Sequence, residues 1–311
     1  MAAALIPLLR DWIRGRLGAE KPSAAVLRKL LRNPTIFKFM SRSARRMIEN
    51  ERQRVWFTVQ TQSLWNSAVP GIPNFVYTDS TVLANLYFKH EDFSSVPSAA
   101  WLNCERAIYT DAAKVLVMSG HVGRSLTELY DIEPPRVARV CVGANLRRPP
   151  SAAQPVPASN KTILFVGVEW ERKGGPELVQ AFRNLPRRHS DARLLIVGVA
   201  PPLEVPRCEI IGRVPAESIS EYYAKAAIFC MPTRIEPFGI AFIEAMMHSV
   251  AVAAPRQGAM LDYIREKETG VLYDLGDWRD TARALTWLLD NPEERQAIAV
   301  RGFEVARTLY T

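Results

Sequence analysis

Two carboxylates, Glu236 and Glu244, stand with seven residues between them in a segment whose other side chains are mostly apolar. Composition and length predict a helix from Gly239 to Met247, in which Glu244 is the only charge. An unpaired carboxylate in such a helix is costly, so Glu244 needs hydrogen-bond donors, and the two hydroxyls of a ribose would supply them. Backbone amides at the start of the helix, at Phe238, Gly239 and Ile240, can face a diphosphate.

Glu236, in the loop before this helix, would then face the sugar beyond the phosphates. The plainer alternative is a helix carboxylate turned to solvent at Glu244 and an incidental loop charge at Glu236. Because short motifs carry a risk of false positives, the spacing alone leaves both interpretations open.

A second segment has the chemistry to match a diphosphate. The sequence Arg-Lys-Gly-Gly-Pro at 172–176 offers two cations, a backbone that a ligand can approach closely, and a helix that opens at Pro176. Lys173 is our preferred ligand of the β-phosphate. The alternative is a solvated turn whose charges are incidental. No metal is expected, since the nearest Asp-x-Asp type candidate, Asp131 with Glu133, lies at a helix end rather than at a strand end.

Three motifs in order resemble retaining glycosyltransferase family 4. They are Ile-Leu-Phe-Val-Gly at 163–167 with the turn at 171–175, Glu-Pro-Phe-Gly-Ile-Ala-Phe-Ile-Glu-Ala-Met at 236–246, and Glu-Thr-Gly-Val-Leu-Tyr at 268–273. The resemblance implies an α/β protein of GT-B type, with two Rossmann-like doubly wound parallel-sheet domains facing a cleft. The C-terminal domain would bind the donor and a reduced N-terminal domain the acceptor.

The resemblance further implies transfer of a hexose-type sugar from a nucleotide-diphosphate sugar to a glycan or lipid-linked acceptor, without a metal and with retention. Glu236 and Lys173 would be catalytic, with Glu236 holding sugar hydroxyls rather than attacking. Many relatives carry an arginine where this chain has Val168, so Arg172 would replace it. On the acceptor side, Asp79 would bind a hydroxyl or, as its commoner use, cap the next helix. The implied donor site comprises Gly167, Arg172, Lys173, Gly174, Glu236, Phe238, Gly239, Ile240 and Glu244.

The chain departs from the family pattern at both ends. It opens with helices rather than with a strand and a Gly-rich loop, and it stops where relatives continue into a helix that returns to the first domain. A fragment, a reduced variant and a nucleotide-sugar-binding protein without turnover all fit these departures. A sugar-nucleotide epimerase would need a carboxylate and histidine set that the sequence does not display.

Positive charge is concentrated near the start. Residues 1–54 carry thirteen Lys and Arg against four acids, a net of +9, whereas the whole chain is +8. Residues 5–17 have an amphipathic pattern with neither a signal peptide's apolar core nor a membrane-spanning length. We expect the basic arm at 1–54 to lie on an anionic membrane surface, or alternatively residues 5–17 to pack on the domain. Nucleic acid is not expected as a partner, because no recognition motif accompanies the charge.

Alternating strand and helix patterns predict the domain organisation. They include strands at 74–78 and 162–167, and helices at 216–226, around 259–265 and at 278–290. The four cysteines are isolated, which favours a reducing compartment and hence a cytoplasmic protein. With its basic arm on the membrane, the protein would be peripheral on the inner membrane face. The predicted segments are a basic helical arm at 1–54, a partial acceptor-side domain at 55–146, a Pro-rich linker at 147–160 and a donor domain at 161–311.

Overall fold

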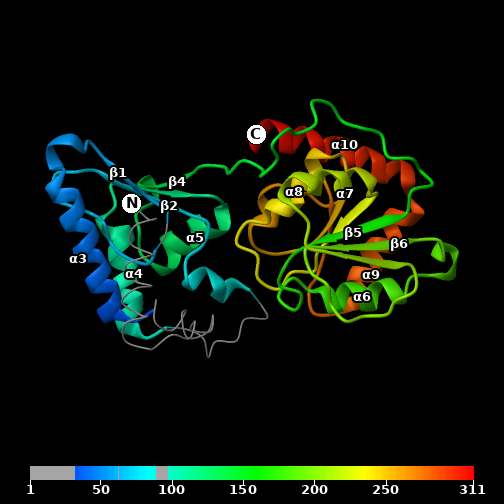
Figure 1. The fold of residues 1–311 in the computed structure, drawn as a ribbon, viewed down its shortest axis with the longest axis horizontal. Coiled ribbons are helices and arrows are strands. Elements are labelled where there is room, and N and C mark those ends of the chain that lie inside the picture. The colour runs from blue at the N-terminus through cyan, green and yellow to red at the C-terminus, as the bar shows by residue number, and fades with distance from the viewer. Residues whose placement is uncertain (1–31, 62, 89–96) are drawn as a thin grey trace. The chain divides into compact units, whose positions relative to one another are not determined.

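The structure is a computed structural model that describes residues 32–61, 63–88 and 97–311 (Figure 1). The amphipathic pattern at 5–17 therefore lies outside the described residues. The described chain divides into two compact units. Unit 1 contains the described residues of 1–84, 92–118 and 122–140, and unit 2 those of 85–91, 119–121 and 141–311.

Unit 1 has a parallel sheet of four strands in the order β1-β2-β3-β4. The strands are β1 (Thr58–Gln60), β2 (Asn74–Thr78), β3 (Lys114–Val117) and β4 (Val137–Arg139). The α-helices are α3 (Pro34–Asn50), α4 (Ala99–Asp111) and α5 (Gly120–Leu129), with short 3-10 turns η1 (Arg52–Arg54), η2 (Leu83–Tyr87) and η4 (Pro134–Arg136). The chain therefore contributes the half of a doubly wound domain that the strand pattern predicts.

Local sequence signals fix where these helices begin. Asn33 precedes α3, and its side-chain oxygen accepts the N–H of Thr35 at 2.8 Å, while Pro34 occupies the first turn. Ser98 caps α4 by accepting the N–H of Trp101. The part of the basic arm that is described thus enters the fold as α3, whose Phe37 belongs to the main core of unit 1.

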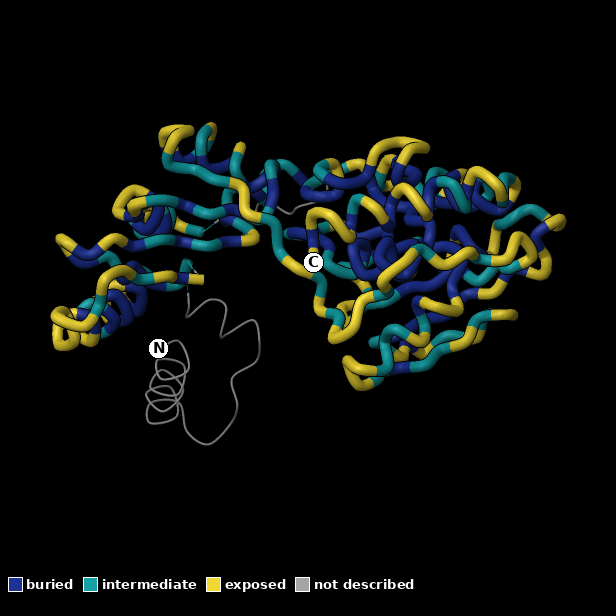
Figure 2. Tube along the Cα trace, turned by 90° about the horizontal axis from the view of Figure 1, so that it is seen from above, coloured by how far each residue is buried: buried dark blue, intermediate teal, exposed yellow. Residues whose placement is uncertain are grey.

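The core of unit 1 lies on one face of its sheet. Alternate strand residues such as Val76, Val115 and Val117 pack against all three helices, whose contacts include Phe37, Ile108 and Leu126. The intervening residues of β2 and β3 are only partly buried, and Val59 of β1 is 57% exposed (Figure 2). Period-2 alternation of this kind marks a sheet with one buried face.

Unit 2 has a parallel sheet of six strands in the order β10-β9-β8-β5-β6-β7. They are β5 (Thr162–Val166), β6 (Arg193–Val197), β7 (Cys208–Gly212), β8 (Ile228–Cys230), β9 (Ala251–Pro255) and β10 (Val271–Tyr273). In Figure 1, α7 (Ile219–Lys225), α8 (Ile240–Met247) and α10 (Pro292–Leu309) lie on one side of this sheet, and α6 (Gly175–Arg183) and α9 (Trp278–Asp290) on the other. The 3-10 turns are η5 (Arg187–His189), η6 (Ala216–Ser218) and η7 (Gly258–Asp262).

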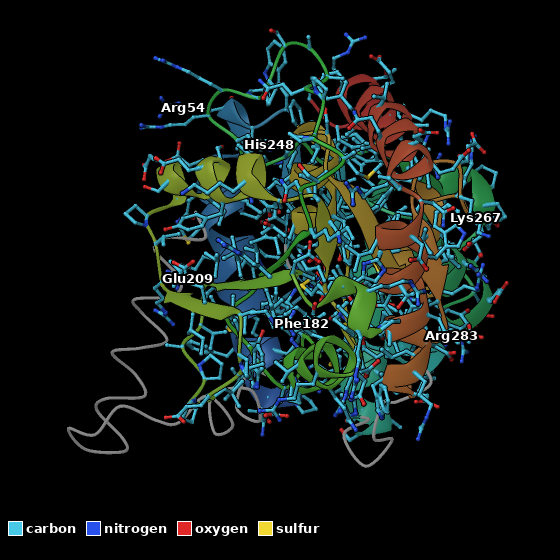
Figure 3. All side chains as sticks on the ribbon, turned by 90° about the vertical axis from the view of Figure 1, so that its right-hand side faces the viewer. Arg54, Phe182, Glu209, His248, Lys267 and Arg283 are labelled. Atoms are coloured by element: carbon cyan, nitrogen blue, oxygen red, sulfur yellow. The ribbon has the colours of Figure 1, made fainter. Side chains whose placement is uncertain are left out.

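Strands β8, β9 and β10 of unit 2 are apolar on both faces. All residues of β8, β9 and β10 are buried, as is Phe182 of α6, which lies within the unit in Figure 3 while Arg283 of α9 lies at its rim. Continuous apolar runs are expected where helices cover both faces of a parallel sheet. The structure is therefore an α/β fold with two parallel sheets.

Two predicted helices have a different form. The helix predicted at 216–226 is the 3-10 turn η6 followed by α7, and the one predicted near 259–265 is the 3-10 turn η7. In η7, Gly258 has a left-handed φ of +58° and the N–H of Tyr263 bonds to the carbonyl of Met260, three residues back. The N–H of Ile264 bonds to the same carbonyl at 2.8 Å, and this bond at the end of the turn is not continued into an α-helix.

Candidate functional site

The predicted donor motifs follow two neighbouring strands of the unit 2 sheet. The chain runs outward from β5 through β6 to β7, then returns to the other side of β5 at β8. In open parallel sheets, ligands bind outside the carboxyl ends of the strands at such a switch point. The segment from Gly167 to Gly174 leaves the end of β5, and the segment from Met231 to Gly239 leaves the end of β8. Hereafter these are the β5 loop and the β8 loop.

Direct contacts join the two loops. The ammonium of Lys173 forms an ion pair with the carboxylate of Glu236, and both side chains are largely buried, at 14% and 9% exposed. Backbone contacts add to this, because the N–H of Arg234 donates to the carbonyl of Arg172 at 2.9 Å. The sequence predicted that Lys173 and Glu236 belong to one site, and the structure brings them into contact.

Arg172 is bound locally instead of pointing freely into the site. Its guanidinium bonds to the carboxylate of Glu169 and to the carbonyl of Ile235. Val168, which stands where many relatives carry an arginine, is 58% exposed. The charge of Arg172 is thus partly neutralised by Glu169, which leaves Lys173 as the more deeply placed cation of the β5 loop.

Two glycines make the loop geometry possible. Gly174 precedes α6 with φ +73°, and a Cβ there would lie 1.8 Å from the carbonyl oxygen of Pro232 in the β8 loop. Gly239 precedes α8 with φ +88°, and its Cβ would lie 2.6 Å from the hydroxyl of Tyr263. Both left-handed backbones and both close approaches require glycine. Neither helix has a side-chain cap. In α6 the N–H of Gly175 donates to the carbonyl of Trp170 and Pro176 has no N–H, so α8 offers a ligand more first-turn amides than α6 does.

Aromatic side chains that the sequence analysis missed fix the Phe238-Gly239 turn. The hydroxyl of Tyr263 donates to the carbonyl of Phe238 at 2.8 Å. The rings of Phe238, Tyr263 and Tyr310 form a cluster with centroids 5.7 to 5.8 Å apart. These contacts join residues distant in sequence, so no local pattern could have predicted them.

Glu244 is buried in α8, at 8% exposed, so the alternative of a carboxylate turned to solvent is wrong. Its Oε2 accepts the hydroxyl of Tyr223 at 3.0 Å, and its carboxylate also accepts the N–H of Asn145. Burial raises the pKa of Glu244 against these two hydrogen bonds. The protein therefore supplies two of the hydrogen-bond donors that we expected ribose hydroxyls to provide for Glu244. A carboxylate has about four acceptor positions, so two remain for hydroxyls.

His248 completes this side of the site. Its ring stacks on that of Tyr223 with centroids 5.2 Å apart, and its Nδ1 lies 2.8 Å from the carbonyl oxygen of Glu244. Burial lowers the pKa of His248. The ring thus stiffens the Tyr223 and Glu244 pair by packing.

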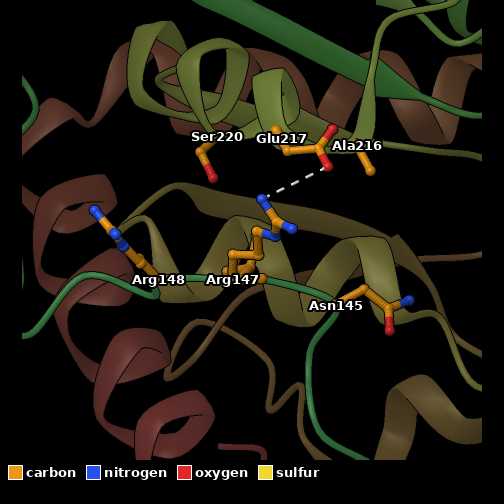
Figure 4. Close-up of a pocket in the computed structure, with 7 residues that line it drawn as sticks. Asn145, Arg147, Arg148, Ala216, Glu217 and Ser220 are labelled. Atoms are coloured by element: carbon orange, nitrogen blue, oxygen red, sulfur yellow. Dashed lines mark ion pairs between the residues drawn. The ribbon is translucent and has the colours of Figure 1, made fainter.

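A pocket of about 720 Å³ lies beside Glu244 in unit 2 (Figure 4). One wall comes from η6 and α7, including Glu217 and Ser220, and the other from the connector at 145–148. In Figure 4 the guanidinium of Arg147 points toward Glu217, 3.9 Å away. Ser220 and Tyr223 are one turn apart on α7, and Asn145 belongs to the pocket while it bonds to Glu244. The pocket is therefore continuous with the surroundings of that carboxylate.

Comparison with known protein families identifies the family of this chain. Residues 150–305, half of the chain, match the family described as glycosyl transferases group 1. The chain belongs to this family. The match covers both loops, the carboxylate on α8, and Phe238 and Tyr263 of the aromatic cluster, whereas Tyr310 lies beyond it.

Individual relatives in this family share about 30% of their residues with the chain. The chain is 30% identical over 76% of its length to a D-inositol 3-phosphate glycosyltransferase of Corynebacterium urealyticum, covering 61% of that protein. It is 32% identical over 42% of its length to a GDP-mannose-dependent alpha-(1-6)-phosphatidylinositol monomannoside mannosyltransferase of Mycolicibacterium smegmatis, covering 39% of it. It spans between 49% and 62% of the first curated relatives.

A solved structure has the same fold. HepE of Anabaena in complex with UDP matches with a TM-score of 0.69 at 14% identity, over 86% of this chain and 78% of that protein. At that identity the likeness concerns the fold alone.

On the acceptor side, Asp79 lies exposed directly after β2 in unit 1. The next turn, η2, is capped by Thr81, whose Oγ1 accepts the N–H of Ala84 at 3.0 Å. The acceptor role of Asp79 stays a prediction. In the described part of the chain, no three His, Cys, Asp or Glu side chains are grouped closely enough to hold a metal ion.

Proposed function

We propose that this glycosyl transferase moves a hexose-type sugar from a nucleotide-diphosphate sugar to a glycan or lipid-linked acceptor, without a metal and with retention, as in family 4. The observation that carries the proposal is the meeting of the β5 and β8 loops at the switch point of the unit 2 sheet. There a buried cation, a carboxylate and two uncapped helix starts lie beside a second carboxylate and a pocket.

Each group has a role in binding the donor. Lys173 and the first amides of α8 neutralise the diphosphate, and Glu236 accepts hydrogen bonds from the sugar hydroxyls. The ribose hydroxyls donate to the two remaining acceptor positions of Glu244. The base occupies the pocket between 145–148 and 216–220. The relatives named above include a GDP-mannose-dependent enzyme, and a neighbour in fold was solved with UDP.

In the proposed reaction, the bond from the anomeric carbon to the phosphate oxygen breaks, and its electron pair goes to that oxygen. The acceptor hydroxyl attacks the anomeric carbon from the same face, and its proton passes to the departing phosphate oxygen. No side-chain nucleophile is required. Fixed positive groups stabilise the charge that develops on the phosphate, which is the usual source of such catalysis.

The proposal is tested by incubating the full chain with nucleotide sugars and with inositol phosphate or phosphoinositide acceptors in the presence of EDTA. We expect a glycoside whose anomeric configuration, read by NMR, is that of the donor. Glu236→Gln should lower kcat far more than Glu209→Gln, a matched change on the edge strand β7 (Figure 3). Donor binding without transfer to any acceptor would favour the alternative of a binding protein without turnover.

We also propose a cytoplasmic location, peripheral on the inner membrane face. All four cysteines are free thiols, in keeping with a reducing compartment. The outer face of α3 combines the exposed Phe39, at 58%, with Lys38, Arg42 and Arg46, and Trp56 nearby in sequence is 86% exposed. Cations with exposed aromatic rings suit an anionic lipid surface. None of the described helices is both long and apolar enough to cross a bilayer.

Vesicle sedimentation tests this attachment. The double change Arg42→Glu and Arg46→Glu should abolish binding to vesicles with anionic lipid, since each cation near such a surface contributes about 1 kcal/mol. The same reversals at Arg193 and Arg213, exposed in unit 2, provide a control of equal charge. Equal loss in both pairs would show that only net charge matters and would contradict a docking face on α3.

A further inference from the structure

A fully buried carboxyl lies in unit 1, outside the candidate donor site. Glu105 of α4 is 0% exposed. Its Oε1 accepts the N–H of Val82 at 3.2 Å and the hydroxyl of Tyr109 at 3.3 Å, and its Oε2 contacts the hydroxyl of Tyr130. Buried carboxyls are costly when charged, so this one needs a reason to be there.

The contacts of Glu105 converge on the segment that follows β2, residues 79–84. Three successive amides of this segment end on side chains. The N–H of Val82 donates to Glu105, that of Leu83 to the Tyr130 hydroxyl at 3.2 Å, and that of Ala84 to Thr81 Oγ1. Thr81 Oγ1 in turn lies 2.6 Å from Ser125 Oγ on α5. Glu105 and its neighbours therefore hold the 79–84 segment from beneath.

The position of the segment gives these contacts a functional meaning. It leaves the carboxyl end of a central strand, and ligands of parallel sheets bind outside this edge, although the order β1-β2-β3-β4 has no switch point. It also carries Asp79, the residue predicted to face the acceptor. A group that fixes the backbone of this segment positions the acceptor side without touching a substrate.

The charge on Glu105 decides how stably it holds the backbone of the 79–84 segment. When Glu105 is neutral, its Oε1 still accepts from Val82, and an Oε2 hydroxyl can donate to the Tyr130 oxygen. When it is charged, the carboxylate stays in a low-dielectric core unless the segment opens and water reaches it. Opening therefore becomes more favourable in the charged state.

We propose that Glu105 is a positioning residue, which holds the 79–84 segment in place while protonated and releases it once charged, so that acceptor binding weakens toward alkaline pH. Only the effect on acceptor binding rests on the proposed transferase function. The opening of the segment is a property of the chain itself.

The surrounding groups support titration near neutrality. Burial raises the pKa of Glu105 to about 7, against the hydrogen bonds from Tyr130, Val82 and Tyr109 and the charge of Arg32. The tyrosines stay neutral, because burial and the nearby Glu105 raise the pKa of both Tyr109 and Tyr130. Arg106 on α4 lies 5.9 Å from the Tyr130 ring centroid and bonds to Asp131. Glu105 is thus the group here whose charge changes between pH 6 and 8.

Hydrogen exchange of the full chain between pH 6 and 8, corrected for the intrinsic exchange rate, tests the inference. A carboxyl whose pKa is about 7 when closed and 4.5 when open gives an opening equilibrium that rises about tenfold over this range. We expect the protection of Val82 and Leu83 to fall by that factor. In Glu105→Gln, which is permanently neutral, the protection should be independent of pH. The exposed Glu133→Gln is the control and should behave as the wild type.

Tyr130→Phe is a second variant that keeps the carboxyl and removes the hydroxyl that accepts from Leu83. Its Leu83 amide should lose protection at every pH. Unchanged protection of the Leu83 amide, or the same pH dependence in Glu105→Gln as in the wild type, would overturn the proposal that Glu105 holds the 79–84 segment in place.

The acceptor KM provides the kinetic readout. It should rise with pH in the wild type and stay flat in Glu105→Gln, while the donor KM is the same in both. A pH-independent acceptor KM alongside pH-dependent exchange would refute the positioning role. Absence of any transfer would refute the proposed function, and exchange would still decide whether Glu105 holds the segment.

Discussion

The two parallel sheets differ in how many of their faces are buried. Along β2 of unit 1, buried and partly buried residues alternate, whereas every residue of β9 in unit 2 is buried. The helices of unit 1 share one core cluster on one face of its sheet, while unit 2 has helices on both faces. The difference shows that a parallel sheet can rest on one core or on two, and the sequence pattern of each strand indicates which.

The largest test of this comparison uses two phenylalanines on central strands. Phe229 of β8 is fully buried with the ring of Phe242 5.0 Å away, whereas Phe75 of β2 is partly buried beside Phe57 at 6.1 Å. We expect Phe229→Ala to lower the free energy of unfolding of unit 2 by about 3–5 kcal/mol. Phe75→Ala should lower that of unit 1 by roughly 1 kcal/mol, because less surface loses its burial.

Urea denaturation followed by hydrogen exchange in each unit measures both losses separately. Equal losses would mean that the open face of the unit 1 sheet is as well packed as the interior of unit 2.

A smaller effect is expected from one substitution made twice within unit 1. Val115→Thr places a hydroxyl in the buried core and should cost about 1–3 kcal/mol. Val59→Thr, on a residue 57% exposed, should change stability by no more than about 0.5 kcal/mol. Thermal unfolding of the two variants compares the faces directly, and similar costs would contradict a single buried face.

A further test concerns pH, whose effect has opposite signs in the two units. The pKa of Glu105 is raised to about 7 by burial, so unit 1 should lose stability as pH rises from about 4.5 through 7. In unit 2, hydrogen bonds from Arg188 and His189 lower the pKa of Asp290 to about 2, so its contribution is present above about 4 and is lost as pH falls toward 2.

Melting curves from pH 2 to 8 test both slopes, with Glu105→Gln and Asp290→Asn as the variants that should flatten one slope each. If a Glu105→Gln protein still loses stability between pH 5 and 7, the loss of unit 1 stability in this range comes from another group.

Much of the fold could be predicted from the sequence, especially in unit 2. The helix at 278–290 and the strand at 74–78 have the predicted bounds, and the strand predicted at 162–167 ends one residue earlier. These segments have long or continuous apolar patterns with clear ends. Shorter segments such as the turn at 258–262 were less predictable, because one glycine conformation decides their form.

The site was predictable where it is local. The spacing of Glu236 and Glu244 and the cations of the β5 loop indicated which residues belong together. Tyr223 and Asn145, which donate to Glu244, were missed because α7 and the connector reach that carboxylate only through tertiary folding. The ion pair of Lys173 was also not foreseen, although a buried cation needs a partner.

The most direct test of the account is calorimetric titration of UDP, GDP and ADP and their sugars into the wild-type chain, Lys173→Ala and Glu244→Ala. Exposed residues outside the two loops, Lys267→Ala and Glu209→Ala, are the matched controls (Figure 3). We predict that one nucleotide family binds, and that each site variant weakens it by about 1.5–3 kcal/mol while the controls do not. Equal affinity in all five proteins would contradict a donor site between the β5 and β8 loops.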